Sequence, residues 1–263
     1  GSRRLGLLVG EHLQVRVPSA AGGAQCGGRI RAYTPVGPLK AAGTLELIVV
    51  AAGDASRQLC ALQPGDHVEA RGPRGVPIYG AYGASRLKLP LCARVVGGSG
   101  ILDVDAIGMV TAGSGITAVL ALVRSLAELA RGGAASVPKL TLVHCERCAD
   151  EVPVLEELLQ LARNSGNDCC CSLALRLFFS GPPRAAGGGG TREAACDAAV
   201  AERPASVAVS RGVRLRSETL RASLPPASGS SCVLVCGPPS FNTSVVSWCV
   251  ADGGFPEHCV HVF

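Results

Sequence analysis

Aromatic side chains are scarce in this sequence of 263 residues, in which one Trp, three Tyr and five Phe make up 3% of the chain. A stacking surface for single-stranded nucleic acid needs several aromatics interleaved with basic residues, so this mode of binding is not expected. Charged residues are also few, at 17%, while 48% are hydrophobic, which excludes a disordered, charge-rich chain. The core must therefore be built mainly from Ala, Val and Leu.

The excess of basic over acidic residues is small, with 25 Lys and Arg against 20 Asp and Glu and a formal net charge of +5. This charge suits an acidic protein partner and is too small to indicate a nucleic-acid-binding surface. The 13 cysteines are an odd number. Many of them, including Cys60, Cys232 and Cys249, lie in apolar runs, where Cys behaves as a small hydrophobic residue. We therefore expect a reducing, cytosolic environment.

The first part of the chain has the rhythm of short strands separated by Pro and Gly. Strands are predicted at 11–17, 29–33, 45–51 and 67–71, with one short helix at 56–62. Several short strands at regular spacing indicate an antiparallel barrel or sandwich. We expect this domain to cover residues 3–100, with its end in the Gly97-Gly98-Ser99-Gly100 stretch.

The second part, residues 101–263, alternates strands with helices. The predicted strands are 107–110, 140–143, 173–179 and 232–236, and the predicted helices are 116–130, 154–162, 216–223 and 241–250. This alternation predicts an α/β domain with a doubly wound parallel sheet. Residues 181–210 form a Gly/Ala/Arg-rich segment without periodicity, which we interpret as an insertion.

Residues 106–123 carry no charge after Asp105 and are long enough to raise the question of a membrane span. Glycines, threonines and a serine at the centre of this stretch instead favour a buried strand, a glycine turn and the first turns of a helix. No signal peptide or transit sequence is visible.

Three local motifs could bind a ligand. Gly113-Ser114-Gly115-Ile116-Thr117 is a glycine turn between strand and helix, where free amides and the helix dipole favour phosphate. Cys236-Gly237-Pro238-Pro239 ends a predicted strand, where α/β sheets bind ligands. Arg31-Ala32-Tyr33-Thr34 places an Arg able to hold phosphate beside an aromatic ring. Each motif alone fits a purely structural turn, loop or strand equally well.

Taken in their order along the chain, the three motifs resemble the NADH–cytochrome b5 reductase family. This family includes the flavin domain of nitrate reductase and lies within the ferredoxin reductase-like superfamily. Further segments resemble the family along the chain: Gly10-Glu11-His12, Gly53-Asp54-Ala55-Ser56, Pro64-Gly65-Asp66, Arg71-Gly72-Pro73 and the tail Phe255–Phe263. The resemblance implies two domains, an antiparallel β-barrel flavin domain and an α/β nucleotide domain. The family's first barrel strand has no counterpart here, which suggests a fragment or a C-terminal module.

The resemblance implies an enzyme in which NAD(P)H gives a hydride to N5 of FAD and single electrons pass to a haem protein such as cytochrome b5. Arg31 would pair with the FAD pyrophosphate, Tyr33 would pack along the isoalloxazine, and Thr34 would hydrogen-bond near N5. His12 is a further flavin-site candidate. Gly53, Ala55 and Ser56 would hold the pyrophosphate by backbone and hydroxyl groups.

On the nicotinamide side, the resemblance implies that Thr117 lies between flavin and nicotinamide. Thr34, Thr117 and Cys236 are the catalytic candidates. The nicotinamide pocket would be formed by Gly113, Ser114, Gly115, Cys236, Gly237 and Pro238. The acceptor is expected to be acidic, and membrane attachment, frequent in the family, would lie upstream of this chain. The expected location is the cytoplasm or the cytoplasmic face of a membrane.

The sequence departs from the family pattern at four positions: Val50 stands where many members have Lys, Ala52 where they have an aromatic, and Ala112 and Ala118 where they have Gly and Pro. The acid that favours NADH by binding the ribose 2′-hydroxyl is not found. Ser210, Arg211 and Arg214 lie there instead, and Arg211 could accept a 2′-phosphate, which keeps NADPH as an alternative to NADH.

Two alternatives remain at this point. His144-Cys145-x-x-Cys148 and Cys169-Cys170-Cys171 raise a zinc site, but structural zinc usually needs paired Cys-x-x-Cys groups, so no metal is expected. The second alternative is a degenerate, non-catalytic module that keeps the fold, binds flavin poorly and serves as a docking domain of a larger redox protein.

Overall fold

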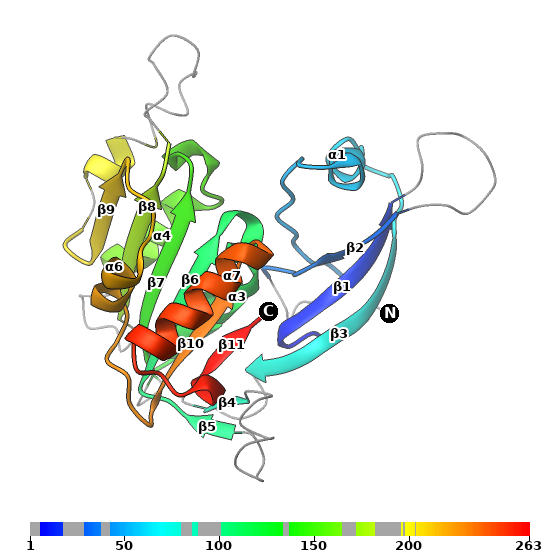
Figure 1. Ribbon diagram of the computed structural model, residues 1–263. Helices are drawn as coiled ribbons and strands as arrows, with labels where there is room; N and C mark the ends of the chain where they lie inside the picture. Colours follow the sequence, from blue (N-terminus) through cyan, green and yellow to red (C-terminus); the bar gives the residue numbers. More distant parts are fainter. Residues whose placement is uncertain are drawn as a thin grey trace.

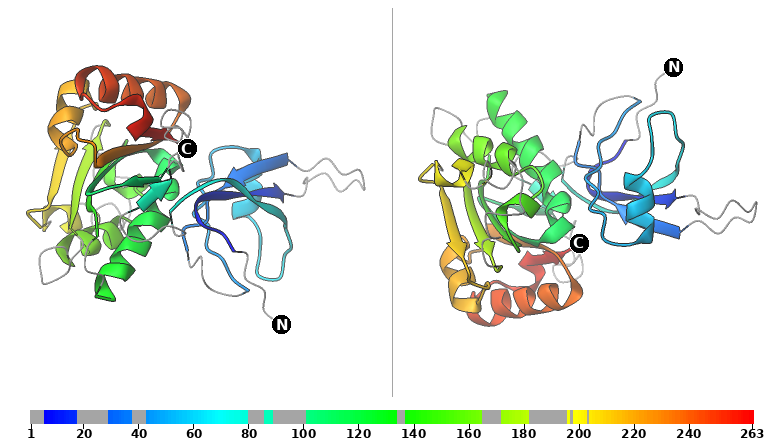
Figure 2. Two further views of the ribbon diagram at one scale, coloured as in Figure 1. Left: turned by 90° about the horizontal axis from the view of Figure 1, so that it is seen from below. Right: turned by 90° about the horizontal axis from the view of Figure 1, so that it is seen from above.

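The computed structural model describes residues 6–17, 29–37, 43–79, 86–88, 101–133, 137–164, 172–181, 196, 198–202 and 204–263. These residues form two lobes that meet along one side, as Figures 1 and 2 show. The smaller lobe carries the N-terminal strands and the larger lobe carries a parallel sheet with helices on both faces. The two-part organisation predicted from the rhythm of the sequence is confirmed.

The small lobe is an antiparallel sheet in the order β2-β1-β3. Its strands are β1 (Val9–Val17), β2 (Arg29–Tyr33) and β3 (Glu69–Tyr79), and helix α1 (Asp54–Cys60) lies against it. Alternation along β1 buries Leu13, Val15 and Val17 in a cluster with Leu7, while the intervening side chains are partly exposed. This arrangement fits the predicted flavin-domain barrel.

The predicted strand at 45–51 is wrong. Leu45 and Leu47 pack on the cluster of β1, which explains the alternating pattern. Only Glu46 pairs, in a single antiparallel bridge with Gly37. A strand needs a continuous partner as well as alternation, and among the described residues this segment has one only at the bridge. The strand predicted at 67–71 begins at Glu69 and continues to Tyr79 because it pairs along the whole of β1.

The large lobe contains a six-stranded, wholly parallel sheet in the order β11-β10-β6-β7-β8-β9. Its strands are β6 (Ala106–Ala112), β7 (Lys139–Glu146), β8 (Leu173–Phe179), β9 (Val207–Arg211), β10 (Ser231–Cys236) and β11 (Val260–Val262). Helices α3 (Ile116–Arg131) and α4 (Leu155–Asn164) cover one face, and α6 (Ser217–Ser223) and α7 (Pro239–Ser247) cover the other. The chain after α7 continues as a π-helical turn, Trp248–Asp252. This is the predicted doubly wound sheet.

Two strands of this sheet were not predicted, β9 and β11. Strand β9 lies within the segment 181–210 that we interpreted as an insertion, so any insertion ends before Val207. Much of that segment, 182–195 with 197 and 203, lies outside the described residues. Both strands are short, and each is identified only by pairing with a longer neighbour, β8 or β10.

The predicted domain boundary at 97–100 lies outside the described residues. On either side of it, β4 (Arg86–Lys88) pairs antiparallel with β5 (Ile101–Asp103). The two lobes also share a core, because Val9, Val36 and Ile78 of the small lobe belong to the same buried cluster as helix α3.

The uncharged stretch around 106–123 forms β6, a 3-10 turn at Gly113–Gly115 and the start of α3, as predicted. By length and composition alone, the helical stretch Gly113–Arg131 could cross a membrane, but more than half of its apolar window (56%) is buried inside the protein. Its apolar face packs on the sheet, so in this fold it is a core helix.

Candidate functional site

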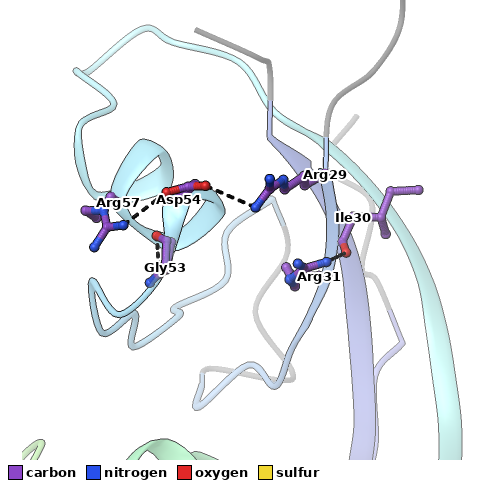
Figure 3. Close-up of polar contacts among 7 residues, drawn as sticks. Arg29, Ile30, Arg31, Gly53, Asp54 and Arg57 are labelled. Carbon is purple, nitrogen blue, oxygen red and sulfur yellow. Dashed lines mark hydrogen bonds and ion pairs between the residues drawn. The ribbon is translucent and has the colours of Figure 1, made fainter.

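The first group of predicted residues gathers at the start of α1, where β2 passes the helix (Figure 3). Arg29 of β2 pairs with Asp54 at 3.1 Å, and Arg57 pairs with the other oxygen of that carboxylate at 3.0 Å. The guanidinium of Arg57 donates to Asp54, and with the charge of Arg29 it holds the pKa of this carboxyl below its ordinary value. Arg29 and Arg57 share this one carboxylate, and Arg31 lies nearby on β2 with its guanidinium on the Ile30 carbonyl, so the cluster keeps a positive excess that suits a pyrophosphate.

The backbone around Gly53 is only partly available to a ligand. The Ser56 hydroxyl oxygen accepts from the amides of Ala52 (3.1 Å) and Gly53 (2.9 Å), and its proton goes to the Gly53 carbonyl at 3.0 Å. The hydroxyl of Ser56 is therefore occupied in capping its own helix. Ala55 is buried, and helix geometry leaves the amides of the first turn without a partner inside the helix. A pyrophosphate contact would therefore have to come from these amides and from Arg31 rather than from the Ser56 hydroxyl.

Tyr33 and Arg31 share one face of the small sheet. They lie opposite Leu13 and Val15, both of which point into the cluster beneath α1. Burial raises the pKa of the Tyr33 phenol, so the ring stays neutral. Arg31 donates to the Ile30 carbonyl at 2.9 Å and keeps an exposed side chain. Thr34 follows directly and is half-buried.

His12 is not brought to this face. It precedes the inward-facing Leu13 on β1, so alternation turns it to the opposite side, where it lies against Gly75 of β3. A Cβ placed on Gly75 would lie 3.2 Å from His12 Nδ1. The same outer face carries a hollow of about 290 Å³ lined by Gln14, Arg16, Ile30, Glu69, Ala70 and Arg71. The structure thus places His12 on the face of the small sheet opposite Tyr33 and Arg31.

The second group of predicted residues meets at the carboxyl end of the parallel sheet. The chain turns toward β7 after β6 and toward β11 after β10, so the boundary between β6 and β10 is the topological switch point of the sheet. Gly113–Thr117 follows β6, and Cys236 ends β10 with Gly237 and Pro238 directly after it. Ligands of open α/β sheets bind at this crevice.

The two turns touch through Gly115. A Cβ on Gly115 would lie 2.2 Å from the Cys236 carbonyl oxygen and 3.1 Å from the Gly237 amide nitrogen. Gly237 is equally tight, since a Cβ there would lie 2.6 Å from the ring of Phe241 and 3.2 Å from the Cβ of Ala112. Any larger residue at either position would collide with these neighbouring atoms, which explains why both positions hold glycine.

Polar groups at this edge are held in place. The Thr117 hydroxyl donates to the Ser114 carbonyl at 2.9 Å, which closes the first turn of α3. Burial raises the pKa of the Cys236 thiol to about 11, so it stays protonated near neutral pH. Cys236 thus contributes to the packing of the turn as a neutral thiol and is not a thiolate nucleophile.

Arg211 ends β9 at the same edge of the sheet, level with Phe179 at the end of β8. Its guanidinium carbon lies 5.6 Å from the centre of the Phe179 ring, and the residue is exposed. The structure therefore brings Arg211 to the ligand-binding edge, two strands beyond β7 and away from the switch point.

The sequence reasoning missed the pairing of His144 with Thr111. His144 is fully buried at the end of β7, and its Nδ1 lies 2.9 Å from the Thr111 hydroxyl on β6. Burial lowers its pKa to about 4 and raises the pKa of Glu146, whose Oε2 lies 3.9 Å from His144 Nε2. A His on an otherwise apolar strand is the signal in the sequence that could have indicated this pair. Among the described residues no cluster of three metal-ligating side chains exists, and Cys169–Cys171 lie outside them.

Comparisons with known proteins agree with these features. Residues 1–79 match the family model of the oxidoreductase FAD-binding domain. The NADH-cytochrome b5 reductase 1 of Neosartorya fischeri is 29% identical over 161 residues, 60% of this chain and 45% of that protein. That of Coccidioides immitis is 28% identical over 162 residues, with the same shares. The predicted resemblance to the NADH–cytochrome b5 reductases is confirmed by these matches. It spans about half the length of these curated relatives.

Solved structures show the same fold. The cytochrome b5 reductase domain of Ulva prolifera nitrate reductase superposes with a TM-score of 0.73 at 18% identity, over 100% of this chain and 87% of that one. The CS-b5R domains of human Ncb5or superpose with a TM-score of 0.64 at 17% identity, over 98% of this chain and 61% of that one. The predicted architecture of this family, a flavin-domain barrel followed by a nucleotide domain, is confirmed.

Proposed function

We propose that this chain is an NAD(P)H-dependent FAD reductase of the cytochrome b5 reductase type, which takes a hydride from NAD(P)H onto FAD and passes single electrons to a haem protein. The close packing of Gly115 on the Cys236–Gly237 peptide at the switch point carries this proposal, because it leaves two turns converging where α/β sheets bind nucleotides. The relatives named NADH-cytochrome b5 reductase support it.

The residues of the small lobe fit FAD. The arginines around α1 supply positive charge for a pyrophosphate, and Tyr33 offers a neutral ring that packs on the same cluster as Leu59 of α1. When bound, the flavin would supply the redox chemistry, accepting a hydride and releasing electrons singly. The chain supplies binding and orientation: Arg31 and the α1 amides hold the phosphates, and Tyr33 with Thr34 supports the ring.

The residues of the large lobe fit a dinucleotide. Gly113–Gly115 presents backbone at the N-terminal end of the 16-residue helix α3. The protonated thiol of Cys236 and the backbone of Gly237 and Pro238 would shape the opposite wall. Thr117 stands at the first turn of α3, with its hydroxyl on the Ser114 carbonyl. No general base is needed for hydride transfer, so the neutral, buried character of the groups is appropriate.

Two further parts of the proposal concern the electron acceptor and the cellular location. The acceptor is an acidic haem protein, in keeping with the net charge of +5. The protein works in the cytoplasm or at the cytoplasmic face of a membrane, and the free thiols of Cys60, Cys145, Cys148, Cys236 and Cys249 support a reducing environment.

The spectrum of the purified protein tests the proposal. After reconstitution with FAD and gel filtration, bound flavin should absorb near the visible maxima of flavins and should bleach when NADH or NADPH is added without oxygen. Reoxidation by ferric cytochrome b5 would then support the acceptor class. A protein that retains no flavin, or flavin that neither dinucleotide bleaches, would overturn the proposal and favour a docking module without catalysis.

A further inference from the structure

Arg124 of helix α3 reaches out of the large lobe and bonds to the small one. Its Nη1 donates to the Val36 carbonyl at 2.7 Å and lies 3.1 Å from a Glu46 carboxylate oxygen. On the side of its own lobe, Nε and Nη2 donate to the two carboxylate oxygens of Glu157 on α4, each at 2.7 Å. One guanidinium therefore joins two helices of the nucleotide lobe to two chain segments of the flavin lobe.

The side chain is held firmly in this position. A bidentate Arg–carboxylate pair fixes the plane of the guanidinium, and only 22% of the Arg124 side chain is exposed. The hydrogen bonds to Glu157 raise the pKa of Arg124, so its charge is permanent at any pH the protein tolerates. Arg124 cannot turn away from the small lobe without breaking two strong bonds to Glu157.

The part of the small lobe that Arg124 contacts is also held in place by hydrogen bonds and burial. Val36 lies beside the bridge between Gly37 and Glu46: its amide donates to the Glu46 carbonyl at 3.0 Å, and the Glu46 amide donates to the Gly37 carbonyl at 2.7 Å. Gly37 lets the guanidinium come close, since a Cβ there would lie 3.3 Å from Arg124 Nη1. Val36 is itself fully buried in the cluster shared with α3.

Val36 and Arg124, the two partners of this contact, each lie close in the chain to a residue of the proposed reaction site. Val36 lies two residues after Thr34, the residue predicted to bond near the flavin. Thr117 lies seven residues before Arg124 on α3, two turns or about 10 Å along the same side of the helix. The chain that carries the flavin-contacting turn is thus tied to the helix that carries the nicotinamide turn.

We propose that Arg124 is the positioning residue that sets the flavin lobe against the nucleotide lobe, so that the two cofactor sites face each other at reacting distance. This inference rests on the proposed reductase function. Hydride transfer needs reacting atoms about 3–3.5 Å apart, and a misplacement of about 1 Å can cost on the order of a hundredfold in rate. Arg124 touches neither cofactor, so its loss should lower the rate of flavin reduction and leave each binding site intact.

The test compares Arg124→Gln with Arg163→Gln, a matched control on α4 whose ion pair with Glu156 at 3.3 Å stays within its own helix. In stopped-flow reduction of the FAD-loaded protein, Arg124→Gln should lower the limiting rate at saturating NADH by about tenfold or more. The NADH dissociation constant and the FAD content should stay within about threefold of the parent, and Arg163→Gln should match the parent throughout. Arg124→Lys, which keeps the charge but loses the fork, should recover only part of the rate.

Glu46→Gln is a milder variant, because it weakens the contact across the lobes and leaves the pair between Arg124 and Glu157 in place. It should lower the limiting rate in the same direction by a smaller factor. The proposal is overturned if Arg124→Gln reduces flavin at the parental rate. It is also overturned if the rate falls only in proportion to FAD or NADH binding that is lost.

Hydrogen exchange separates this inference from the reductase proposal, because it needs no activity. In Arg124→Gln, the amides of Val36 and Glu46 should exchange at least about tenfold faster, while those of β7 and β8 should be unchanged. If no dinucleotide reduces the parent protein, the reductase proposal fails, and this measurement still decides whether Arg124 joins the lobes. Unchanged exchange at Val36 and Glu46 would overturn the inference whatever the activity.

Discussion

Gly115 and Cys236 lie in direct backbone contact, so close that a Cβ on Gly115 would stand 2.2 Å from the Cys236 carbonyl oxygen. The contact joins the turn after β6 to the turn after β10 at the switch point of the sheet. Since the obstructing atoms are backbone, no side-chain rotation relieves the clash. The site therefore depends on the absence of a single methyl group.

Gly115→Ala should push the two turns apart and abolish flavin reduction by NADH, with at least about a hundredfold fall in kcat/KM, because the crevice would no longer hold the dinucleotide in reacting geometry. Gly229→Ala is the matched control, since no atom lies within 4 Å of the added Cβ. Steady-state kinetics and FAD absorbance check the result. If Gly115→Ala retained parental kcat/KM, the two turns would not be part of the reaction site.

The buried His144 should make the protein less stable in acid. Its pKa in the folded state is about 4, below the ordinary value of 6.5. Between these two values the unfolded chain takes up the proton and the folded protein does not, so stability falls as pH decreases from about 7 to 4. From pH 7 to pH 5, the loss should be about 2 kcal/mol.

Urea unfolding at pH 7 and pH 5 measures this loss. His144→Phe, which cannot be protonated, should flatten the part of the pH dependence that comes from His144, while replacing the exposed His67 by Gln should leave the slope as it is. An equal pH dependence in the parent and in His144→Phe would show that the imidazole is not kept neutral by burial.

Arg31→Ala should weaken FAD binding without unfolding the small lobe, because Arg31 is exposed and its one hydrogen bond that the structure shows goes to the Ile30 carbonyl. A charge-assisted bond to phosphate is worth about 1.5–3 kcal/mol, so the FAD dissociation constant should rise about tenfold to a hundredfold. Arg16→Ala serves as the control, since Arg16 pairs with Glu69 on the opposite face of the same sheet. Fluorescence titration with FAD measures both, and equal weakening in the two variants would contradict a phosphate role specific to Arg31.

Arg211→Ala should change the preference between the two dinucleotides. If Arg211 holds a 2′-phosphate at the end of β9, kcat/KM for NADPH should fall about fivefold to tenfold while that for NADH stays nearly constant. Arg221→Ala, in the last turn of α6, is a control of the same charge. An unchanged ratio of the two kcat/KM values would remove Arg211 from the site and leave NADH as the expected donor.

Local patterns were sufficient for most of the elements. The alternation in residues 11–17 and the apolar residues at helical spacing in 116–130 predicted β1 and α3, because both patterns record which side of an element is buried. The strand predicted at 45–51 shows where this fails: Leu45 and Leu47 are packed as a strand would pack them, but only Glu46 finds a backbone partner. The backbone partners of a strand lie outside its own segment, so the local pattern of residues does not show whether they are present.

The same division holds for the site. The sequence by itself determined the two-part architecture, the order of the motifs and the kinship with the reductase family, because glycines, prolines and an Arg-x-Tyr-Thr run are properties of neighbouring residues. Only the tertiary structure decided that Gly115 touches Cys236, that Ser56 caps its own helix, that His12 faces away from Tyr33, and that Arg124 spans both lobes. These are contacts between residues distant in sequence, or choices among local hydrogen-bond partners, and only the packing of the whole chain selects among them.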